Sequence, residues 1–371
     1  MSLKPSKIWC MSGLSYDPGH QNDDLDRLYM KRCIELAKRG GKHVRPNPMV
    51  GSVLVHQNKI IGEGYHEQFG KAHAEVNCLR SVELQHRKLI PTSTLYVSLE
   101  PCNIVGKTPA CSDLILSEHL QRLVVGALDP NPLVNGSSLD HLRTKGVVVK
   151  HGVCKNDAEQ LIRPFSVNMN SKRPYVILKT VKSSDHFIGR QGEKIWLSNE
   201  FSSTLSHKWR TEVDGILVGT TTALMDNPSL TARLYPGENP IRIVLDRSGK
   251  IPIEHAVFSN EADTIVFTEL NRLNHNNISY IKIDFQQKDF IDRLLQELFS
   301  IGVYVLMIEG GAQMIRSFLD SGKWDEARVI TTSNRLFNGV AAPNMTGKLI
   351  LRQMLDNDEL QIIYNDQQKN T

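Results

Sequence analysis

The hydrophobic positions between residues 23 and 39 recur at the spacing of an amphipathic helix. Apolar side chains fall about three and four positions apart, at Leu25, Leu28, Cys33, Leu36 and Ala37. The pair Gly40-Gly41 follows directly, and glycine commonly ends a helix. The pattern therefore predicts a helix over residues 23–39.

Beyond this helix the chain changes to short apolar runs separated by polar turns. Residues 52–56 and 60–65 flank the polar turn 57–59, which predicts a β-hairpin. The later pattern predicts alternating elements: a helix after Ala72, a strand at 94–98, a helix after Cys111, a strand at 122–127, a helix at 138–145 and a strand at 147–151. Such alternation is typical of an α/β domain with helices on both faces of one sheet, which we place at residues 23–166.

A polar stretch with few apolar residues, 168–173, ends at Pro174 and predicts a linker over residues 167–174. A second α/β pattern occupies residues 175–371. Its predicted strands lie at 175–179, 215–219, 241–246, 264–268 and 303–308, and its clearer helices at 199–212, 289–301 and 312–319. No internal repeat relates the two halves. Two unlike domains suggest two linked activities.

Length and composition agree with this division. A chain of 371 residues exceeds the usual limit of one hydrophobic core. Its 40% hydrophobic and 23% charged residues fit an ordinary soluble globular protein, and no apolar run approaches the ~20 residues of a membrane span. Residues 1–22 lack the basic and apolar segments of a secretory signal and, rich in Ser, Pro and Gly, predict a disordered extension. The net charge of +4 permits phosphate-bearing ligands without indicating a nucleic-acid surface.

Six cysteines are too few for a disulfide framework in so long a chain, so we expect reduced thiols in the cytoplasm. Four of them are interpreted as incidental or buried thiols: Cys10, Cys33, Cys78 and Cys154. Cys102 and Cys111 differ because of the residues around them.

The pattern that indicates chemistry is His73-Ala74-Glu75, followed by Pro101-Cys102 and, after eight residues, Cys111. Imidazole and thiolate are ligands that zinc favours, and a catalytic zinc keeps three protein ligands and one position open to water. Glu75 is the candidate to take the proton of that water and return it to a leaving amine. This His-x-Glu and Pro-Cys arrangement is the signature of zinc-dependent deaminases.

The signature makes a structural demand. Residues two apart point away from each other in mid-helix, so His73 and Glu75 can converge only if His73 stands at the start of a helix. Cys111 before residues 112–116 would also place a thiolate at a helix N-terminus, where the dipole favours it. A closed structural zinc with Cys78 or His66 as fourth ligand is the alternative, and it leaves Glu75 without a role.

At this point the sequence resembles the cytidine-deaminase superfamily and, within it, the bifunctional riboflavin-biosynthesis deaminase/reductase family. The long cysteine loop ending in Gly106-Lys107-Thr108-Pro109-Ala110-Cys111 carries the resemblance. Further matching blocks are Pro46-Asn47-Pro48-Met49-Val50-Gly51, Gly62-Glu63-Gly64-Tyr65-His66 and Asp129-Pro130-Asn131-Pro132. The resemblance implies that Asn47 and His66 line the pyrimidine pocket and that Lys107 lies near the substrate phosphate.

The second half resembles the reductase part of the same family, which implies a dihydrofolate-reductase-like α/β fold that uses NADPH. The blocks that match are residues 179–185, residues 207–233 and Glu309-Gly310-Gly311. The last of these would place bare backbone N–H groups at a helix start, a seat for a cofactor pyrophosphate, although glycines also simply make tight turns there. Two arginines, Arg210 and Arg233, suit a bidentate grip on the ribose phosphate of the substrate, but either fits a solvated surface as well.

The resemblance assigns individual residues in this half. It implies NADPH contacts at Val181, Trp196, Thr222, Asp226, Gly311, Ala312, Gln313, Met314, Ile315, Arg316 and Ser317. It implies substrate contacts at Lys179, Arg210, Leu230, Arg233 and Glu309. The chain departs from the family at four positions. Ile104 stands where the family commonly has His, and His186 where it has Gly. Lys194 stands in place of a small polar residue, and Arg247 in place of Ser. We hypothesise that Arg247 favours the 2′-phosphate of NADPH.

Two consecutive reactions follow from the resemblance, with Zn²⁺ and NADPH as cofactors. The first is deamination of 2,5-diamino-6-ribosylamino-4(3H)-pyrimidinone 5′-phosphate, and the second is reduction of the ribosyl group to ribityl, giving 5-amino-6-ribitylamino-uracil 5′-phosphate. The expected partner is this small phosphorylated pyrimidine, with no nucleic acid and no membrane, and analogy suggests a homo-oligomer. The alternative is a deaminase of another nucleotide or of RNA, with a non-catalytic nucleotide-binding second domain.

Overall fold

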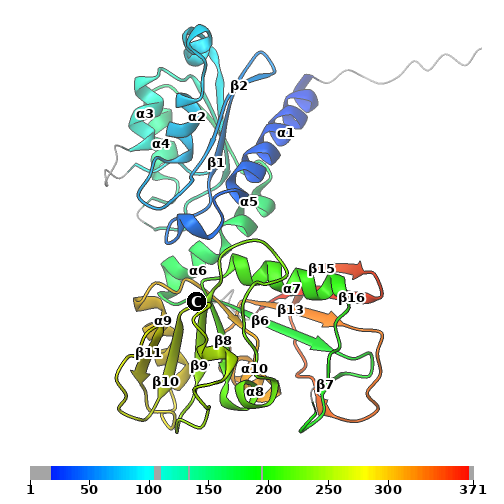
Figure 1. Cartoon of the computed structure of the whole chain (residues 1–371). Coiled ribbons are helices and arrows are strands. Elements are labelled where there is room, and N and C mark those ends of the chain that lie inside the picture. Colours follow the sequence, from blue (N-terminus) through cyan, green and yellow to red (C-terminus); the bar gives the residue numbers. More distant parts are fainter. Residues whose placement is uncertain (1–17, 104–109, 133, 194, 367–371) are drawn as a thin grey trace, which may run out of the picture. The chain divides into compact units, whose positions relative to one another are not determined.

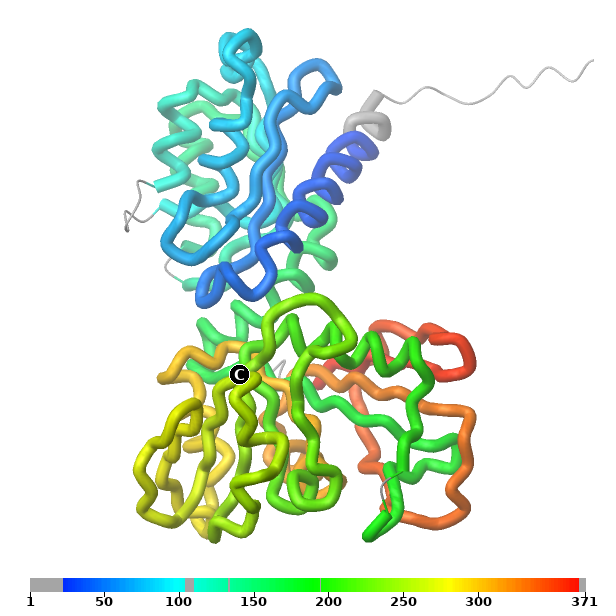
Figure 2. The backbone as a smooth tube through the Cα atoms, viewed as in Figure 1, coloured from blue at the N-terminus to red at the C-terminus, as the bar shows by residue number. Residues whose placement is uncertain are grey.

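The computed structural model of the chain describes residues 18–103, 110–132, 134–193 and 195–366, with side chains described from residue 23 onward. Among these residues the contacts separate two compact units (Figures 1 and 2). The first comprises the chain up to Gly40 together with Met49–Leu161, and the second comprises Gly41–Pro48 and the chain from Ile162 onward. In the described part of the chain, no helix is long and apolar enough to cross a membrane.

The first unit is built on a five-stranded sheet in the order β2-β1-β3-β4-β5. The strands are β1 Gly51–His56, β2 Lys59–Tyr65, β3 Thr94–Leu99, β4 Arg122–Ala127 and β5 Val148–His151. The helices are α1 Pro18–Lys38, α2 Ala74–Arg80, α3 Cys111–Ser117, α4 Ser137–Thr144 and α5 Lys155–Leu161, with 3-10 turns η1 Gly41–Val44, grouped with the second unit, and η2 Leu84–Thr92. The β1–β2 hairpin is antiparallel to β3, and β3, β4 and β5 are parallel. The predicted alternation is confirmed, and α1 starts five residues before the predicted Asp23.

Helices cover both faces of this sheet, as expected (Figure 1). Helices α1 and α5 pack on one face, and α2 and α3 on the other, where α4 also lies against α3. Glycine permits the closest of these contacts. A Cβ at Gly51 would lie 2.0 Å from the carbonyl oxygen of Cys33 in α1, and one at Gly64 would lie 2.2 Å from the backbone nitrogen of Cys78 in α2. The glycines in the two matching blocks therefore allow the sheet to lie close to its helices.

The second unit contains a mixed nine-stranded sheet in the order β11-β10-β9-β8-β12-β6-β13-β16-β15. Its strands are β6 Tyr175–Lys182, β8 Gly215–Gly219, β9 Ile241–Leu245, β10 Thr264–Thr268, β11 Ile278–Lys282, β12 Val305–Ile308, β13 Glu326–Thr331, β15 Lys348–Leu355 and β16 Asp358–Tyr364. Neighbouring strands from β11 to β13 are parallel, and β16 and β15 continue antiparallel. Strands β7 Phe187–Gly189 and β14 Val340–Ala341 form a separate pair.

The helices of the second unit are α6 Arg163–Ser171, α7 Glu200–Glu212, α8 Thr220–Asp226, α9 Phe290–Ser300 and α10 Ala312–Ser321, with a 3-10 turn η3 Ala256–Phe258. Two hydrophobic cores fill the two sides of the sheet. One includes Leu294 of α9 and Phe318 of α10, and the other includes Trp209 of α7 and Ala223 of α8. The five predicted strands and three predicted helices are present within a few residues of their expected bounds.

The segment predicted as a linker is partly helical. Residues 167–171 continue helix α6 instead of forming a loop. Asn168, which contributed to the polar signal, is buried, and its side-chain amide donates to the carbonyl oxygens of Arg173 and Tyr304 at 2.8 and 2.9 Å. Polar composition was misleading here because the polar group is satisfied inside the fold.

Candidate active sites

Helix α2 sets the position of the first pair of candidate residues. His73 is the N-cap residue of α2, with extended backbone angles, and Glu75 lies in the first turn. The structural demand made by the His-x-Glu pattern is therefore met. The Glu75 side chain is buried, at 3% exposure, and lies beside the Cys111 thiol.

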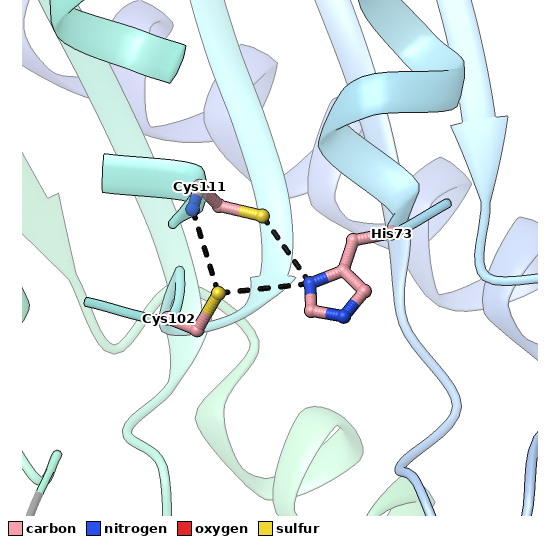
Figure 3. A group of neighbouring side chains, drawn as sticks. All are labelled: His73, Cys102 and Cys111. Carbon is pink, nitrogen blue, oxygen red and sulfur yellow. Dashed lines mark hydrogen bonds between the residues drawn. The ribbon is translucent and has the colours of Figure 1, made fainter. Parts of the chain in front are cut away.

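Two cysteines approach His73 from the opposite side of the site (Figure 3). Cys102 follows the end of β3, and Cys111 is the first residue of α3. The Sγ atoms of Cys102 and Cys111 lie 3.6 and 3.3 Å from His73 Nδ1. The backbone N–H of Cys111 donates to Cys102 Sγ at 3.4 Å. Ligand atoms of all three side chains thus lie within 4.8 Å of one another.

These side chains fit a catalytic zinc. One imidazole and two thiols are a donor set that Zn²⁺ favours, and the candidate cluster among the described residues has these three members. Neither Cys78 nor His66, the alternative fourth ligands, joins this cluster: the Cys78 thiol bonds to Ser52 instead, and burial raises its pKa to about 12. A site with three protein ligands and a buried carboxylate beside them is the arrangement of a catalytic centre.

The side chains of this cluster shift one another's pKa values. The neighbouring Cys111 thiol, and then the His73 ring, lower the pKa of the Cys102 thiol, whereas the same contact with Cys102 raises the pKa of Cys111. Burial, followed by the charge of Cys102, raises the pKa of Glu75 above that of an ordinary carboxyl group. A carboxylate with a raised pKa is a better proton acceptor.

Of the three predicted pyrimidine and phosphate contacts, the structure brings one to this cluster. The His66 ring packs edge-on against the His73 ring with centroids 5.5 Å apart, and its Nδ1 contacts the carbonyl oxygen of Ala72 at 3.0 Å. Burial lowers the pKa of His66. Asn47 belongs to Gly41–Pro48, which groups with the second unit, and Lys107 and Ile104 lie outside the described residues.

The second unit contains a cleft of about 1290 Å³. Residues at the carboxyl ends of four parallel strands line it, at β6, β12, β8 and β9. The ends of parallel strands are the usual ligand site of open α/β sheets. All five predicted substrate contacts of this half line the cleft: Lys179, Arg210, Leu230, Arg233 and Glu309.

A buried ion cluster forms one wall of the cleft. Arg210 of α7 donates from Nε and Nη2 to the two carboxylate oxygens of Glu309 at 3.0 and 2.8 Å, and Lys179 Nζ lies 3.7 Å from the same carboxylate. Burial alone would raise the pKa of Glu309, but the charges of Arg210 and then Lys179 outweigh it and hold the pKa at about 2. Burial lowers the pKa of Lys179, against the attraction of Glu309.

Arg210 has a further partner inside the protein. Its remaining terminal nitrogen, Nη1, donates to the carbonyl oxygen of Thr231 at 2.9 Å, so three of the five guanidinium N–H donors are engaged within the protein. The contact of Arg210 with the substrate phosphate stays a prediction. Arg233 lines the same cleft, is exposed and donates to Ser229 Oγ at 3.0 Å.

The residues predicted to bind NADPH lie mostly along the cleft, around the start of α10. Gly311 is the N-cap of α10, and its backbone N–H donates to Thr222 Oγ1 at 3.0 Å. Nine of the predicted cofactor contacts line the cleft: Val181, Trp196, Thr222, Asp226, Gly311, Ala312, Gln313, Met314 and Ser317. Two do not. Ile315 is fully buried in the core, and exposed Arg316 donates to the carbonyl oxygen of Ala341. A contiguous motif on a helix cannot face one cleft throughout, because successive residues turn away.

The structure adds His207 to the predicted residues. It lies one helical turn before Arg210 on α7, is buried, and lines the same cleft. Burial, and then the charges of Arg210 and Arg233, lower the pKa of His207 to about 4. The spacing of three residues from Arg210 is a signal that the sequence offered, since such residues share a helix face.

Two of the four departures from the family can be located. His186 has φ of +67°, in the left-handed region where glycine carries no steric cost, which explains the glycine usual at this position. Arg247 follows β9, lines the cleft and pairs with Glu269, Nε to Oε2, at 2.9 Å. Lys194 lies outside the described residues.

Comparison with known proteins finds a family match for each half of the chain. The family model of the cytidine and deoxycytidylate deaminase zinc-binding region matches residues 23–127, and that of the RibD C-terminal domain matches residues 174–360. The riboflavin biosynthesis protein RibD of Aquifex aeolicus is 36% identical over 327 residues, which cover 86% of this chain and 90% of the relative. That of Bacillus amyloliquefaciens is 34% identical over 346 residues, or 91% and 92% of the two chains.

A solved structure gives the same result for the fold. The diaminohydroxyphosphoribosylaminopyrimidine deaminase/5-amino-6-(5-phosphoribosylamino)uracil reductase of Thermotoga maritima aligns with a TM-score of 0.84 and 32% identity, covering 93% of this chain and 99% of that one. The chain therefore belongs to the RibD family of riboflavin biosynthesis proteins.

Proposed function

We propose that this chain is a bifunctional enzyme of riboflavin biosynthesis. Its first activity deaminates 2,5-diamino-6-ribosylamino-4(3H)-pyrimidinone 5′-phosphate, and its second reduces the ribosyl side chain of the product to ribityl. The observation that carries this proposal is the presence, on one chain, of a His73–Cys102–Cys111 cluster with a buried Glu75 and of a second unit whose cleft holds Lys179, Arg210 and Glu309. We assign the deaminase to residues 23–166 and the reductase to residues 175–371.

In the deaminase unit, His73, Cys102 and Cys111 would hold zinc. When bound, zinc supplies a Lewis acid that lowers the pKa of a water molecule toward neutrality. Glu75 accepts a proton from the attacking water on its carboxylate oxygen and delivers it to the departing amino nitrogen. The burial of Glu75 suits both steps, because it keeps solvent from competing for the proton. His66, packed on the His73 ring, would contact the pyrimidine, as would Asn47, and Lys107 the phosphate.

In the reductase unit, the backbone around Gly311 would bind the NADPH pyrophosphate at the start of α10. NADPH supplies the hydride. Lys179 and Glu309 face the cleft beside each other and would orient the ribosyl group, while exposed Arg233 would bind the phosphate. Arg210 then acts through Glu309, which it holds in place. Positioning supplies most of the catalysis in this half.

A coupled assay tests both activities on one preparation. The assay follows ammonia release and NADPH loss with wild type and with Glu75→Ala. We expect Glu75→Ala to retain zinc, to lose ammonia release and still to reduce substrate that was deaminated beforehand. Ammonia release by Glu75→Ala at the wild-type rate would exclude the proposed role of Glu75. A wild type that oxidises no NADPH with deaminated substrate would exclude the reductase.

The alternative function, a deaminase of another nucleotide or RNA with a non-catalytic second domain, is not favoured. The reductase family model matches residues 174–360, so the second half resembles an enzyme and not only a binding domain. We further infer a cytoplasmic homo-oligomer that does not bind nucleic acid. The free thiols of the described cysteines support the cytoplasmic location, and the small net charge of +4 supports the absence of nucleic-acid binding. The homo-oligomer rests on analogy with similar enzymes. Sedimentation with and without added transfer RNA tests the oligomeric state and the nucleic-acid binding.

A further inference from the structure

We propose that Glu100 is a positioning residue of the deaminase site, which fixes the zinc ligand Cys102 by joining it to the start of helix α4. This inference rests on the proposed zinc deaminase and concerns a residue that no motif in the sequence singled out. Glu100 is two positions before Cys102, directly after the end of β3, and its side chain is buried, at 3% exposure.

Four donors surround the Glu100 carboxylate. Its Oε2 accepts from the backbone N–H groups of Asp129 and Gly136 at 3.2 and 2.9 Å. Its Oε1 accepts from the backbone N–H and the hydroxyl group of Ser138 at 3.2 and 2.7 Å. Among the described residues no cation forms an ion pair with it. A buried charge is costly unless it is hydrogen-bonded. The four donors offset this cost for the Glu100 carboxylate, and they also fix the position of the chain at Glu100.

Cys102 is held from both sides by the same helix start. Glu100 bonds to Gly136 and Ser138, and Asn103, on the other side of Cys102, donates from Nδ2 to Ser137 Oγ at 2.8 Å. Gly136 is the N-cap of α4, with φ of +81°, a conformation that glycine adopts without strain. The negative carboxylate at the N-terminus of α4 is also favoured by the helix dipole.

The consequence for the metal site is direct. Cys102 has no secondary structure of its own, and its Sγ must lie near both His73 and Cys111. Residues that orient the ligands of a metal, without touching it, tune its affinity. The two anchors on α4 limit the movement of the Cys102 turn, so Glu100 acts on zinc through Cys102.

Glutamine is the informative substitution at this position. It has nearly the shape of glutamate, but its amide NH₂ must replace one carboxylate oxygen. Placed at Oε2, the NH₂ would face two backbone N–H groups; placed at Oε1, it would face the N–H of Ser138. Neither orientation satisfies all the donors. The exposed Glu83, before η2, gives a matched control with the same chemical change in the same unit.

The test measures zinc affinity by competition with a chromophoric chelator, and the thiolate-to-metal spectrum of the cobalt(II)-substituted protein. For Glu100→Gln we expect a roughly 10- to 100-fold loss of zinc affinity, an altered cobalt spectrum and slower ammonia release. The rate of NADPH oxidation by the same chain should not change, and Glu83→Gln should match wild type throughout. A merely structural role would lower the melting temperature and leave the zinc affinity and cobalt spectrum of the folded protein unchanged.

Folded Glu100→Gln with wild-type zinc affinity and cobalt spectrum would overturn the proposal. If Glu100→Gln does not fold, Ser138→Ala and Asn103→Ala each remove one anchor and should each weaken zinc binding. Wild-type affinity in both of these variants would equally overturn it. Failure of the proposed function is distinguishable, because then wild type itself would bind no zinc or release no ammonia.

Discussion

Replacing Glu309 by glutamine removes the one negative charge of the buried cluster with Arg210 and Lys179. In wild type these two cations hold the pKa of Glu309 at about 2, below its ordinary 4.5. At about 1.4 kcal/mol for each pH unit, this difference corresponds to about 3 kcal/mol of stability. Removing one partner of a buried ion pair typically costs about 3–5 kcal/mol, so two routes give the same magnitude.

The melting temperature of the second unit reports this loss. In a unit of about 200 residues, 1 kcal/mol shifts the melting temperature by roughly 2–4 °C, and we therefore expect Glu309→Gln to lower it by about 6–12 °C at pH 7. Tryptophan fluorescence is a suitable probe because three of the four tryptophans, Trp196, Trp209 and Trp324, lie in this unit. Glu297→Gln, an exposed position on α9, is the control.

The pH dependence gives a second, independent check on the same substitution. A carboxyl group whose pKa is lowered by folding stabilises the protein fully above its unfolded pKa, and this stabilisation is lost as the pH falls through the folded pKa. The contribution of Glu309 should therefore be complete above pH 4.5 and disappear toward pH 2. The difference between wild type and Glu309→Gln should shrink over that interval. A shift below about 2 °C at pH 7, or a difference independent of pH, would refute the reasoning.

Three further outcomes are expected. Asp26→Asn should destabilise the first unit by about 3–5 kcal/mol in chemical denaturation, because the buried Asp26 carboxylate accepts two bonds from Arg122 at 3.0 and 2.8 Å; a loss under about 1 kcal/mol would contradict this. Gly311→Ala should fold normally, since an added Cβ meets only Thr222 at 3.5 Å, yet weaken NADPH binding measured by calorimetry, and unchanged affinity would argue against this seat. For His207, folding lowers the pKa from 6.5 to about 4, so its burial costs no stability above pH 6.5, and stability is lost as the pH falls from 6.5 toward 4. His207→Asn should remove this part of the pH dependence of the melting temperature. A wild-type melting temperature that is constant between pH 6.5 and 4 would speak against this reasoning.

The elements that were predicted correctly are those that depend on local pattern. The strands at 122–127, 215–219 and 264–268 have the predicted bounds, since continuous apolar runs between turns indicate buried strands of a parallel sheet. Strands β7, β11, β13, β14, β15 and β16 of the second unit were not predicted, and β15 shows one reason. Its side chains are mostly exposed at the edge of the sheet, so its sequence carries no clear hydrophobic signal. Helix α6 was missed because its buried Asn168 resembles a loop residue until its partners are known.

The sequence by itself determined the zinc chemistry of this protein. The residue types and spacing of His73, Glu75, Cys102 and Cys111 match the signature of zinc-dependent deaminases. The close spacing of His73 and Glu75 also predicted that His73 stands at the start of a helix, where the structure has it. Only the tertiary structure decided which partners the distant residues choose. Arg210 and Glu309 are 99 positions apart, and strand order and register bring them together, so the pairing of this arginine with a carboxylate is not visible in the sequence. The support that Glu100 gives Cys102 is of the same kind, because buried donors select their acceptors only after the chain has folded.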